Sequence, residues 1–131
     1  MRHTISLAFL LAFMAPQWAG AEDDFFWNEN DAIIAYRKGM TVRVPPHDFV
    51  EACLTLGPGS HRRYAFATPE PLDFNVHYHD PAGIFYLTEA KDVQNEAGLI
   101  TTKHANVYCW MWENKEPARV ELTFRIWAAL E

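Results

Sequence analysis

Two histidines spaced one residue apart, His77 and His79, are the side chains in this sequence best placed to do chemistry. They lie in residues 73–80, which read DFNVHYHD and alternate apolar with polar residues. If this run is a β-strand, the two histidines are about 6.5–7 Å apart and point to the same side of the sheet. Two neutral imidazoles placed in this way can converge on one metal ion, and they suit copper or zinc.

Two sulfur-containing side chains could complete such a site. Met111 would add a thioether, and Cys109 a thiolate if it were free; a mixed nitrogen and sulfur set favours copper, Cu(I) above all. The sequence differs from a blue-copper pattern, because no histidine separates Cys109 from Met111. The alternative is that His77 and His79 lie on a solvated sheet face. The candidate metal ligands are therefore His77, His79 and Met111, with copper as the candidate cofactor and no cofactor as the alternative.

The first 21 residues have the features of a secretory signal peptide. Arg2 supplies positive charge, residues 5–15 form an apolar run of eleven, and Ala19-Gly20-Ala21 matches an A-x-A cleavage site. Eleven apolar residues are fewer than the roughly 20 that a membrane-spanning helix needs. We expect cleavage after Ala21, a periplasmic or secreted location, and a mature chain without a membrane span.

The remaining chain suits a single acidic domain. Cleavage would leave 110 of the 131 residues and, because Arg2 is lost, would change the net charge from −6 to −7. This length is close to the size at which one hydrophobic core becomes self-sufficient. An acidic chain with no basic run gives no electrostatic basis for binding nucleic acid. The expected partner is a protein or a small ligand of unknown identity.

Both cysteines, Cys53 and Cys109, lie in the part of the chain that would be exported. Outside the cytosol, a pair of cysteines favours a disulfide. A catalytic thiol or a metal-binding thiolate is the alternative, and each of these needs special partners.

Short β-strands are indicated by period-two patterning from residue 41 to residue 127. The runs cover residues 41–44, 49–56, 62–67, 72–79, 84–87, 99–102, 106–112 and 118–127. About seven or eight short strands, separated by turns, indicate an all-β fold, an antiparallel β-sandwich. The domain would span residues 41–131, after an N-terminal extension at 22–40 in which residues 31–39 fit either two helical turns or a strand.

The same periodicity assigns faces to the strand that carries the histidines. Leu72, Phe74, Val76 and Tyr78 are predicted to face the core, so His77, His79 and Asn75 face the other way. Asn75 is therefore a candidate for surface contact.

The face of the run at 106–112 stays open. Tyr108, Trp110 and Trp112 share one side, and aromatic side chains of this size ordinarily fill a core. A disulfide at Cys109 would instead draw the opposite side inward. Trp112, next to Glu113, is a second candidate for surface contact at a strand end.

Several segments together resemble the GOLD (Golgi dynamics) domain, the lumenal β-sandwich of small transmembrane cargo receptors of the early secretory pathway. The matching positions are Glu51 and Cys53, then Leu72-Asp73-Phe74 running into Asp80-Pro81-Ala82-Gly83, then Tyr108-Cys109 with Asn114. The resemblance covers about residues 49–127 and implies a GOLD-like β-sandwich with a Cys53–Cys109 disulfide. The cargo-receptor role does not transfer, because no membrane span or coiled coil follows Trp127.

The sequence contains no G-x-S-x-G elbow, H-E-x-x-H motif or P-loop, and it therefore predicts a non-enzyme without catalytic residues. The first functional hypothesis is an exported, disulfide-stapled binding module, periplasmic in a bacterium. The alternative is a small copper-handling periplasmic protein that uses His77, His79 and Met111.

Overall fold

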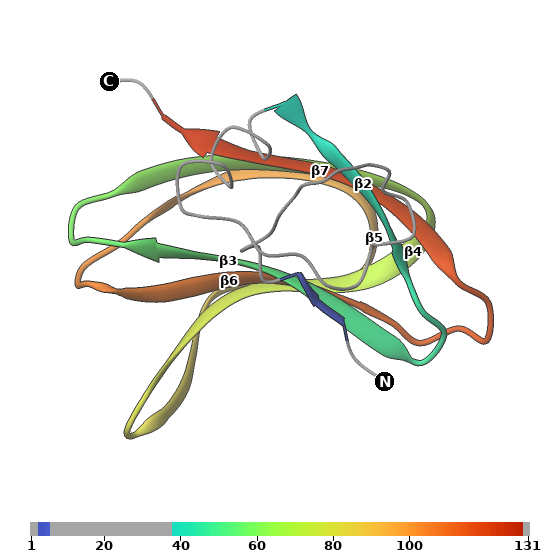
Figure 1. The fold of residues 1–131 in the computed structure, drawn as a ribbon, viewed down its shortest axis with the longest axis horizontal. Helices are drawn as coiled ribbons and strands as arrows, with labels where there is room; N and C mark the ends of the chain where they lie inside the picture. Colours follow the sequence, from blue (N-terminus) through green and yellow to red (C-terminus); the bar gives the residue numbers. More distant parts are fainter. Residues whose placement is uncertain (1–2, 6–37, 130–131) are drawn as a thin grey trace.

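The computed structural model of the chain describes residues 3–5 and 38–129, and these residues form β-strands joined by short turns (Figure 1). The predicted all-β class is confirmed. The predicted cleavage site after Ala21 and most of the predicted extension, residues 22–37, lie outside the described residues. The strands are β1 (His3–Ile5), β2 (Met40–Val44), β3 (Asp48–Leu56), β4 (His61–Asp80), β5 (Gly83–Thr101), β6 (Asn106–Asn114) and β7 (Val120–Ala128).

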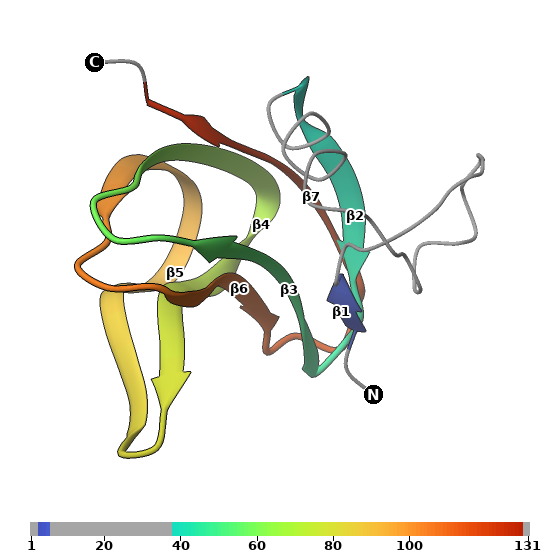
Figure 2. The same ribbon diagram turned by 60° about the vertical axis from the view of Figure 1, so that its left-hand side comes forward.

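One continuous sheet folds over on itself into two layers, because β4 and β5 are long and bend (Figures 1 and 2). Neighbouring strands follow the order β1-β3-β6-β4-β7-β2, and β5 pairs with β4. The first half of β4 pairs with β7 over residues 62–67, and the second half pairs with β6 over residues 73–78. One layer is thus formed by β2, β7 and the first half of β4, and the other by β3, β6 and the second half of β4.

The core lies between these layers, where aromatic rings from the two layers meet. The ring of Trp112 on β6 is 4.8 Å from that of Phe124 on β7 and 5.7 Å from that of Phe66 on the first half of β4, measured between centroids. Alternate residues of each strand supply the other core side chains, as the period-two pattern predicts. The antiparallel β-sandwich expected from the sequence is therefore the observed fold.

Two pairs of predicted short strands are each one long strand in the structure. The runs at 62–67 and 72–79 both belong to β4, although Pro69 and Pro71 lie between them. A proline cannot donate to a sheet ladder, and the pairing of β4 with β5 shifts register between Ala67 and Leu72. The prolines therefore mark the place where β4 passes from one layer to the other without ending it.

The polar stretch at 88–97, which the sequence left unassigned, is the middle of β5. Among the described residues, β5 pairs only with β4 and is an edge strand. An edge strand with much of its surface in water does not need the alternation that identifies a half-buried strand, so the two runs at 84–87 and 99–102 appeared separate. Both runs belong to β5 up to Thr101.

The buried amide of Asn114 joins the corner between β2 and β3 to the turn after β6. Its Nδ2 donates to the carbonyl oxygens of Val44, Pro45 and Ala118 at 3.2, 3.2 and 2.8 Å, and its Oδ1 accepts the N–H of Glu116 at 2.9 Å. This residue is 0% exposed. The asparagine in the GOLD-like pattern thus has a structural role here.

Three residues of the predicted signal peptide also lie in the sheet. Strand β1 pairs in parallel with β3, with His3 opposite Val50 and Ile5 opposite Ala52. Cleavage after Ala21, which stays a prediction, would uncover this edge of β3. In the described part of the chain, no helix is both long and apolar enough to span a membrane.

Candidate functional site

The outer face of the β3-β6-β4 layer brings the predicted site residues into neighbouring rows. One row, read across the strands, is Cys53, Cys109, His77 and Tyr86. His77 therefore lies between the disulfide and an aromatic ring, and its exposed fraction is only 4%. The prediction that His77 projects from the outer face is correct, but its neighbours cover it.

The imidazole of His77 is held in one orientation. Its Nδ1 lies 2.7 Å from Oδ1 of Asn75, an oxygen that can only accept, so Nδ1 carries the proton and Nε2 keeps its lone pair. Burial lowers the pKa of His77, and the nearby charge of His79 lowers it further. The lowered pKa favours the neutral form of His77, the form in which imidazole binds metals.

The structure brings His79 to His77 and places Met111 one row away. The two imidazole centroids are 5.1 Å apart with rings at 70°, and His79 is exposed. Met111 on β6 lies opposite Asn75, so it is a diagonal neighbour of His77 on the same face. Metal binding by these three side chains stays a prediction.

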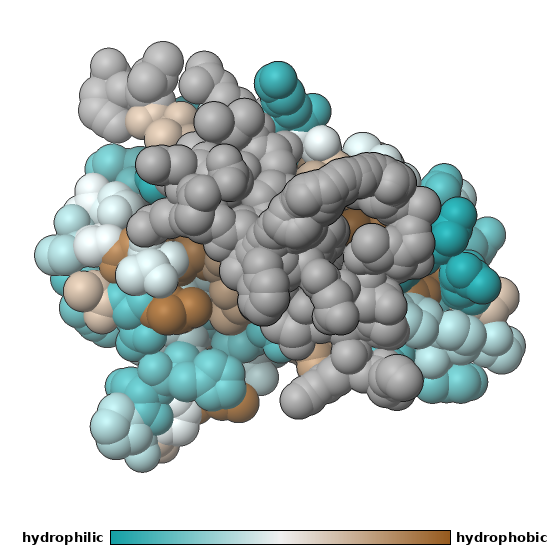
Figure 3. Space-filling view, viewed as in Figure 1, coloured by the Kyte–Doolittle hydropathy of each residue, from teal (hydrophilic) through white to brown (hydrophobic). Residues whose placement is uncertain are grey.

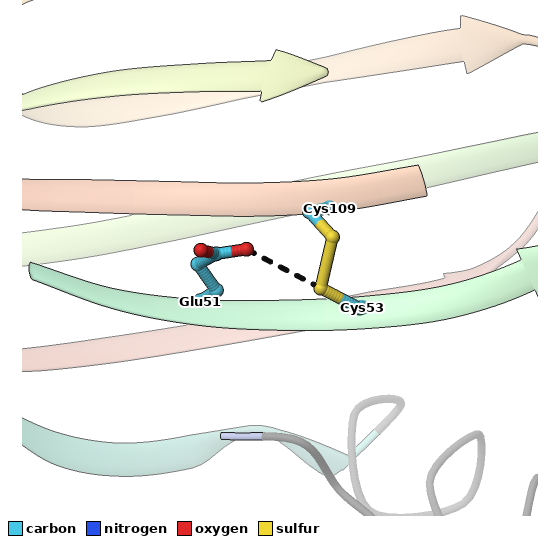
Figure 4. A group of neighbouring side chains, drawn as sticks. All are labelled: Glu51, Cys53 and Cys109. Atoms are coloured by element: carbon cyan, nitrogen blue, oxygen red, sulfur yellow. Dashed lines mark hydrogen bonds between the residues drawn. A yellow bond between two sulfur atoms is a disulfide. The ribbon is translucent and has the colours of Figure 1, made fainter. Parts of the chain in front are cut away.

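The Cys53–Cys109 disulfide that the resemblance implies is present, and it removes both thiolates from the metal candidates. The two cysteines are directly opposite on β3 and β6, with Cα atoms 4.1 Å apart. A carboxylate oxygen of Glu51 approaches Sγ of Cys53 at 3.5 Å (Figure 4). Because a disulfide sulfur has no hydrogen to donate, this approach is a packing contact. The group of Glu51, Cys53 and Cys109 therefore offers a metal only its carboxylate.

The position of this disulfide also settles the polarity of β6. The bond joins neighbours in one layer and does not cross between layers, so it places no demand on the core. Tyr108, Trp110 and Trp112 consequently face inward, each 1% exposed or less.

The expectation that Trp112 contacts the surface is wrong. Strand β6 continues to Asn114, so Trp112 is not at a strand end, and its ring packs against Phe66, Phe74 and Phe124. Asn75, the other candidate, is half-buried on the outer face, where its amide oxygen accepts from His77.

An exposed apolar ridge at the β4–β5 hairpin was missed by the sequence analysis. This hairpin extends past the other strands (Figure 2), and immediately after its turn Ile84, Phe85 and Tyr86 are 48%, 41% and 50% exposed. We call these three residues the hairpin ridge. Three consecutive apolar residues after an Asp-Pro-x-Gly turn were the available signal, because a half-buried strand would alternate.

A cleft of about 260 Å³ lies between the residues that flank the turn of this hairpin and the loop before β6. Tyr78 is central to it: its ring stacks on Phe85 with 5.5 Å between centroids and meets His104 and Tyr108 at 5.0 and 5.2 Å. Leu87 and Tyr86 line the hairpin side, and residues 101–104 line the opposite side. We call this the aromatic cleft.

The space-filling view separates polar from apolar surface on one face of the molecule. Brown, hydrophobic residues on the described surface of this face occur in small areas among larger hydrophilic ones (Figure 3). Three consecutive exposed apolar side chains, as in the hairpin ridge, form a candidate binding surface.

Comparisons with known proteins identify the fold. No family model matches the sequence, and no curated protein matches it. The structure is similar to that of Aeromonas hydrophila PliG, a periplasmic lysozyme inhibitor of g-type lysozyme. The TM-score is 0.54 at 10% identity, over 96% of this chain and 99% of that chain. It is also similar to the Yersinia pseudotuberculosis-derived mitogen, with a TM-score of 0.51 at 6% identity, over 71% of this chain and 86% of that one. At these identities the likeness establishes a shared fold alone.

Proposed function

We propose that this chain is an exported, non-enzymatic binding module that contacts a partner protein through the hairpin ridge. The observation that carries the proposal is the exposure of Ile84, Phe85 and Tyr86 in consecutive positions at a projecting hairpin. Leaving apolar surface in water forgoes roughly 25 cal/mol for each Å² that could have been buried. A partner that covers the ridge recovers this free energy.

The shape of the ridge indicates the kind of partner surface it fits. Successive residues of β5 point to opposite sides, so Ile84 and Tyr86 cover one side of the hairpin and Phe85 covers the other. The stacking of Phe85 on Tyr78 stiffens the hairpin from within, which lowers the entropy lost on binding. A stiff projection that is apolar on both sides suits a groove in the partner.

Two observations support the exported part of the proposal. The disulfide is typical of proteins that fold outside the cytosol, and the similar PliG structure is that of a periplasmic inhibitor. That inhibitor acts on a protein, g-type lysozyme, which makes this enzyme the first partner to try here. The Cys53–Cys109 bond is the one that the GOLD resemblance implies, and a GOLD-like assignment remains part of the proposal.

Cross-linking in cells tests the ridge without knowledge of the partner. A photoreactive phenylalanine analogue at position 84 should give a protein adduct, and the same analogue at Leu99 should not. Leu99 is the matched control, because it is 47% exposed and lies at the far end of β5. Absence of a specific adduct at position 84 would exclude the ridge as the interface. Calorimetric titration of g-type lysozyme with the parent and with Ile84→Asp then tests that partner directly.

Copper handling by His77, His79 and Met111 is the second candidate function. The observation that favours it is the fixed orientation of His77, whose Nδ1 is engaged by Asn75 and whose Nε2 keeps its lone pair. Hydrogen bonds of this kind orient the histidine ligands of metal sites. Two imidazoles with a nearby thioether would suit Cu(I) better than a closed structural zinc site.

A further inference from the structure

The aromatic cleft has the size and lining of a binding site for one side chain. Its volume of about 260 Å³ exceeds the ~150 Å³ of a cavity that holds a benzene molecule. Tyr78, Phe85 and Tyr108 supply ring faces and edges, and aromatic pairs are favourable beyond the area they bury. A single aromatic side chain therefore fits the space and the chemistry.

The loop side of the cleft is held in place by hydrogen bonds. The hydroxyl of Tyr108 donates to the carbonyl oxygen of His104 at 2.7 Å. Thr102 is bound from both directions: its N–H donates to Ser60 at 3.0 Å, and its hydroxyl donates to Gly57 at 2.6 Å. The cleft is consequently formed before any ligand arrives, which spares the cost of ordering a loop on binding.

Lys103 gives the cleft an electrostatic preference. It is exposed at the edge of the cleft, the lining includes no carboxylate, and no acidic group of residues 38–129 is within ion-pair distance of its Nζ. A cation in this position favours a ligand with a carboxylate next to its ring. On a chain of net charge −6, the site also differs in sign from the molecule as a whole.

We infer that the aromatic cleft binds an aromatic residue of the partner protein that is followed by an acidic residue. The ring enters the aromatic cleft beside Tyr78, and the carboxylate pairs with Lys103. The inference rests on the proposed function for the partner being a protein, and it assigns the cleft as the place where one side chain anchors. The hairpin ridge would then make the contacts that surround this anchor.

Short blocked peptides test the cleft without the partner. Calorimetry or NMR titration would compare Ac-Gly-Phe-Asp-Gly-NH₂ with versions in which Ala replaces Phe or Asn replaces Asp. The Phe-Asp peptide should have an affinity at least about ten-fold higher than that of the Ala-Asp peptide, because it buries one aromatic side chain. Replacing Asp by Asn should weaken binding about two- to five-fold, as expected for an exposed ion pair.

Variants of exposed residues show where the peptide binds. Thr101→Trp should block the cleft, whereas Thr101→Val should bind the Phe-Asp peptide as the parent does. Lys103→Met should remove the difference between the Asp and Asn peptides. The inference is overturned if Thr101→Trp leaves peptide affinity unchanged, or if the Ala-Asp peptide binds as well as the Phe-Asp peptide. These results are separate from cross-linking at position 84, because Ile84 does not line the cleft.

Discussion

The phenol ring of Tyr64 on β4 lies directly over Gly98, its cross-strand neighbour on β5. A methyl group at Gly98 would be 2.6 Å from Cζ of Tyr64, closer than side chains approach. The Tyr64 ring is also packed against Phe74, at 5.4 Å between centroids, and Trp110, at 6.5 Å. The absence of a side chain at position 98 is therefore what allows Tyr64 to close this part of the core.

Gly98→Ala should lower the free energy of unfolding by about 1–3 kcal/mol, the usual cost of overpacking a core. Urea unfolding followed by tryptophan fluorescence would measure it. Gly57→Ala is the matched control, since a methyl group there would meet no atom within 4 Å. Equal effects of the two substitutions would contradict the packing account of Gly98.

Loss of the Cys53–Cys109 disulfide should destabilise the domain severely. The bond links residues 56 positions apart, and closing a loop of this length contributes about 4 kcal/mol on the chain-entropy model. Small domains have a net stability of about 5–15 kcal/mol. Thermal unfolding of Cys53→Ala/Cys109→Ala should therefore show a greatly lowered midpoint, and a dithiol reductant should lower the midpoint of the parent but not that of the variant.

The fold could be predicted because a half-buried strand alternates apolar and polar residues, and this alternation shows which side of the strand faces the core. The alternation in β3 and β7 survives intact in the structure, and so does that in the second half of β4, apart from Asp73 and His77, which are covered on the outer face. The long strands were harder to predict, because prolines usually end strands and here they mark a bend between layers. The middle of β5 has one sheet neighbour among the described residues and much of its surface in water, so its sequence lacks the apolar-polar alternation of a half-buried strand.

The candidate site could be predicted only in part. Placing His77 and His79 on one face requires local periodicity alone. The burial of His77 depends on Cys109 and Tyr86, which reach it from strands β6 and β5. The aromatic cleft likewise joins Tyr78 to a loop some 25 residues later in the chain. Contacts of this kind follow from sheet register, which the sequence of one strand does not specify.

Asp73 should make stability depend on acid pH. Burial alone would raise its pKa, but the hydrogen bond from Lys115, the N–H of Asp92 and the charges of Lys115 and Lys91 outweigh burial and leave the pKa below its usual value. The Nζ atoms of Lys115 and Lys91 lie 2.7 and 3.6 Å from Oδ2. Because the pKa is lower in the folded state, the carboxylate stabilises the fold above the ordinary aspartate pKa of about 4. That contribution is lost as pH falls below this value.

Asp73→Asn should therefore reduce stability at pH 7 by about 1–3 kcal/mol, the cost of breaking a buried hydrogen-bonded charge. It should also make the free energy of unfolding fall less steeply as pH drops below about 4. Urea unfolding at a series of pH values would measure both effects. Glu121→Gln, at an exposed position on β7, should retain the acid slope of the parent. An unchanged slope in Asp73→Asn would assign the acid sensitivity to other groups.

Copper binding at the outer face can be tested with protein that carries no histidine tag. The parent should bind one equivalent, and His79→Ala should weaken it about ten-fold or more without affecting the fold, because His79 is exposed. Met111→Leu should weaken Cu(I) more than Zn(II), since only the softer ion gains from a thioether. His47→Asn is the control: it removes an exposed imidazole elsewhere, and asparagine tolerates the positive φ of 52° found there. If His77→Ala/His79→Ala binds copper as the parent does, the two histidines serve no metal and the binding-module proposal stands without this alternative.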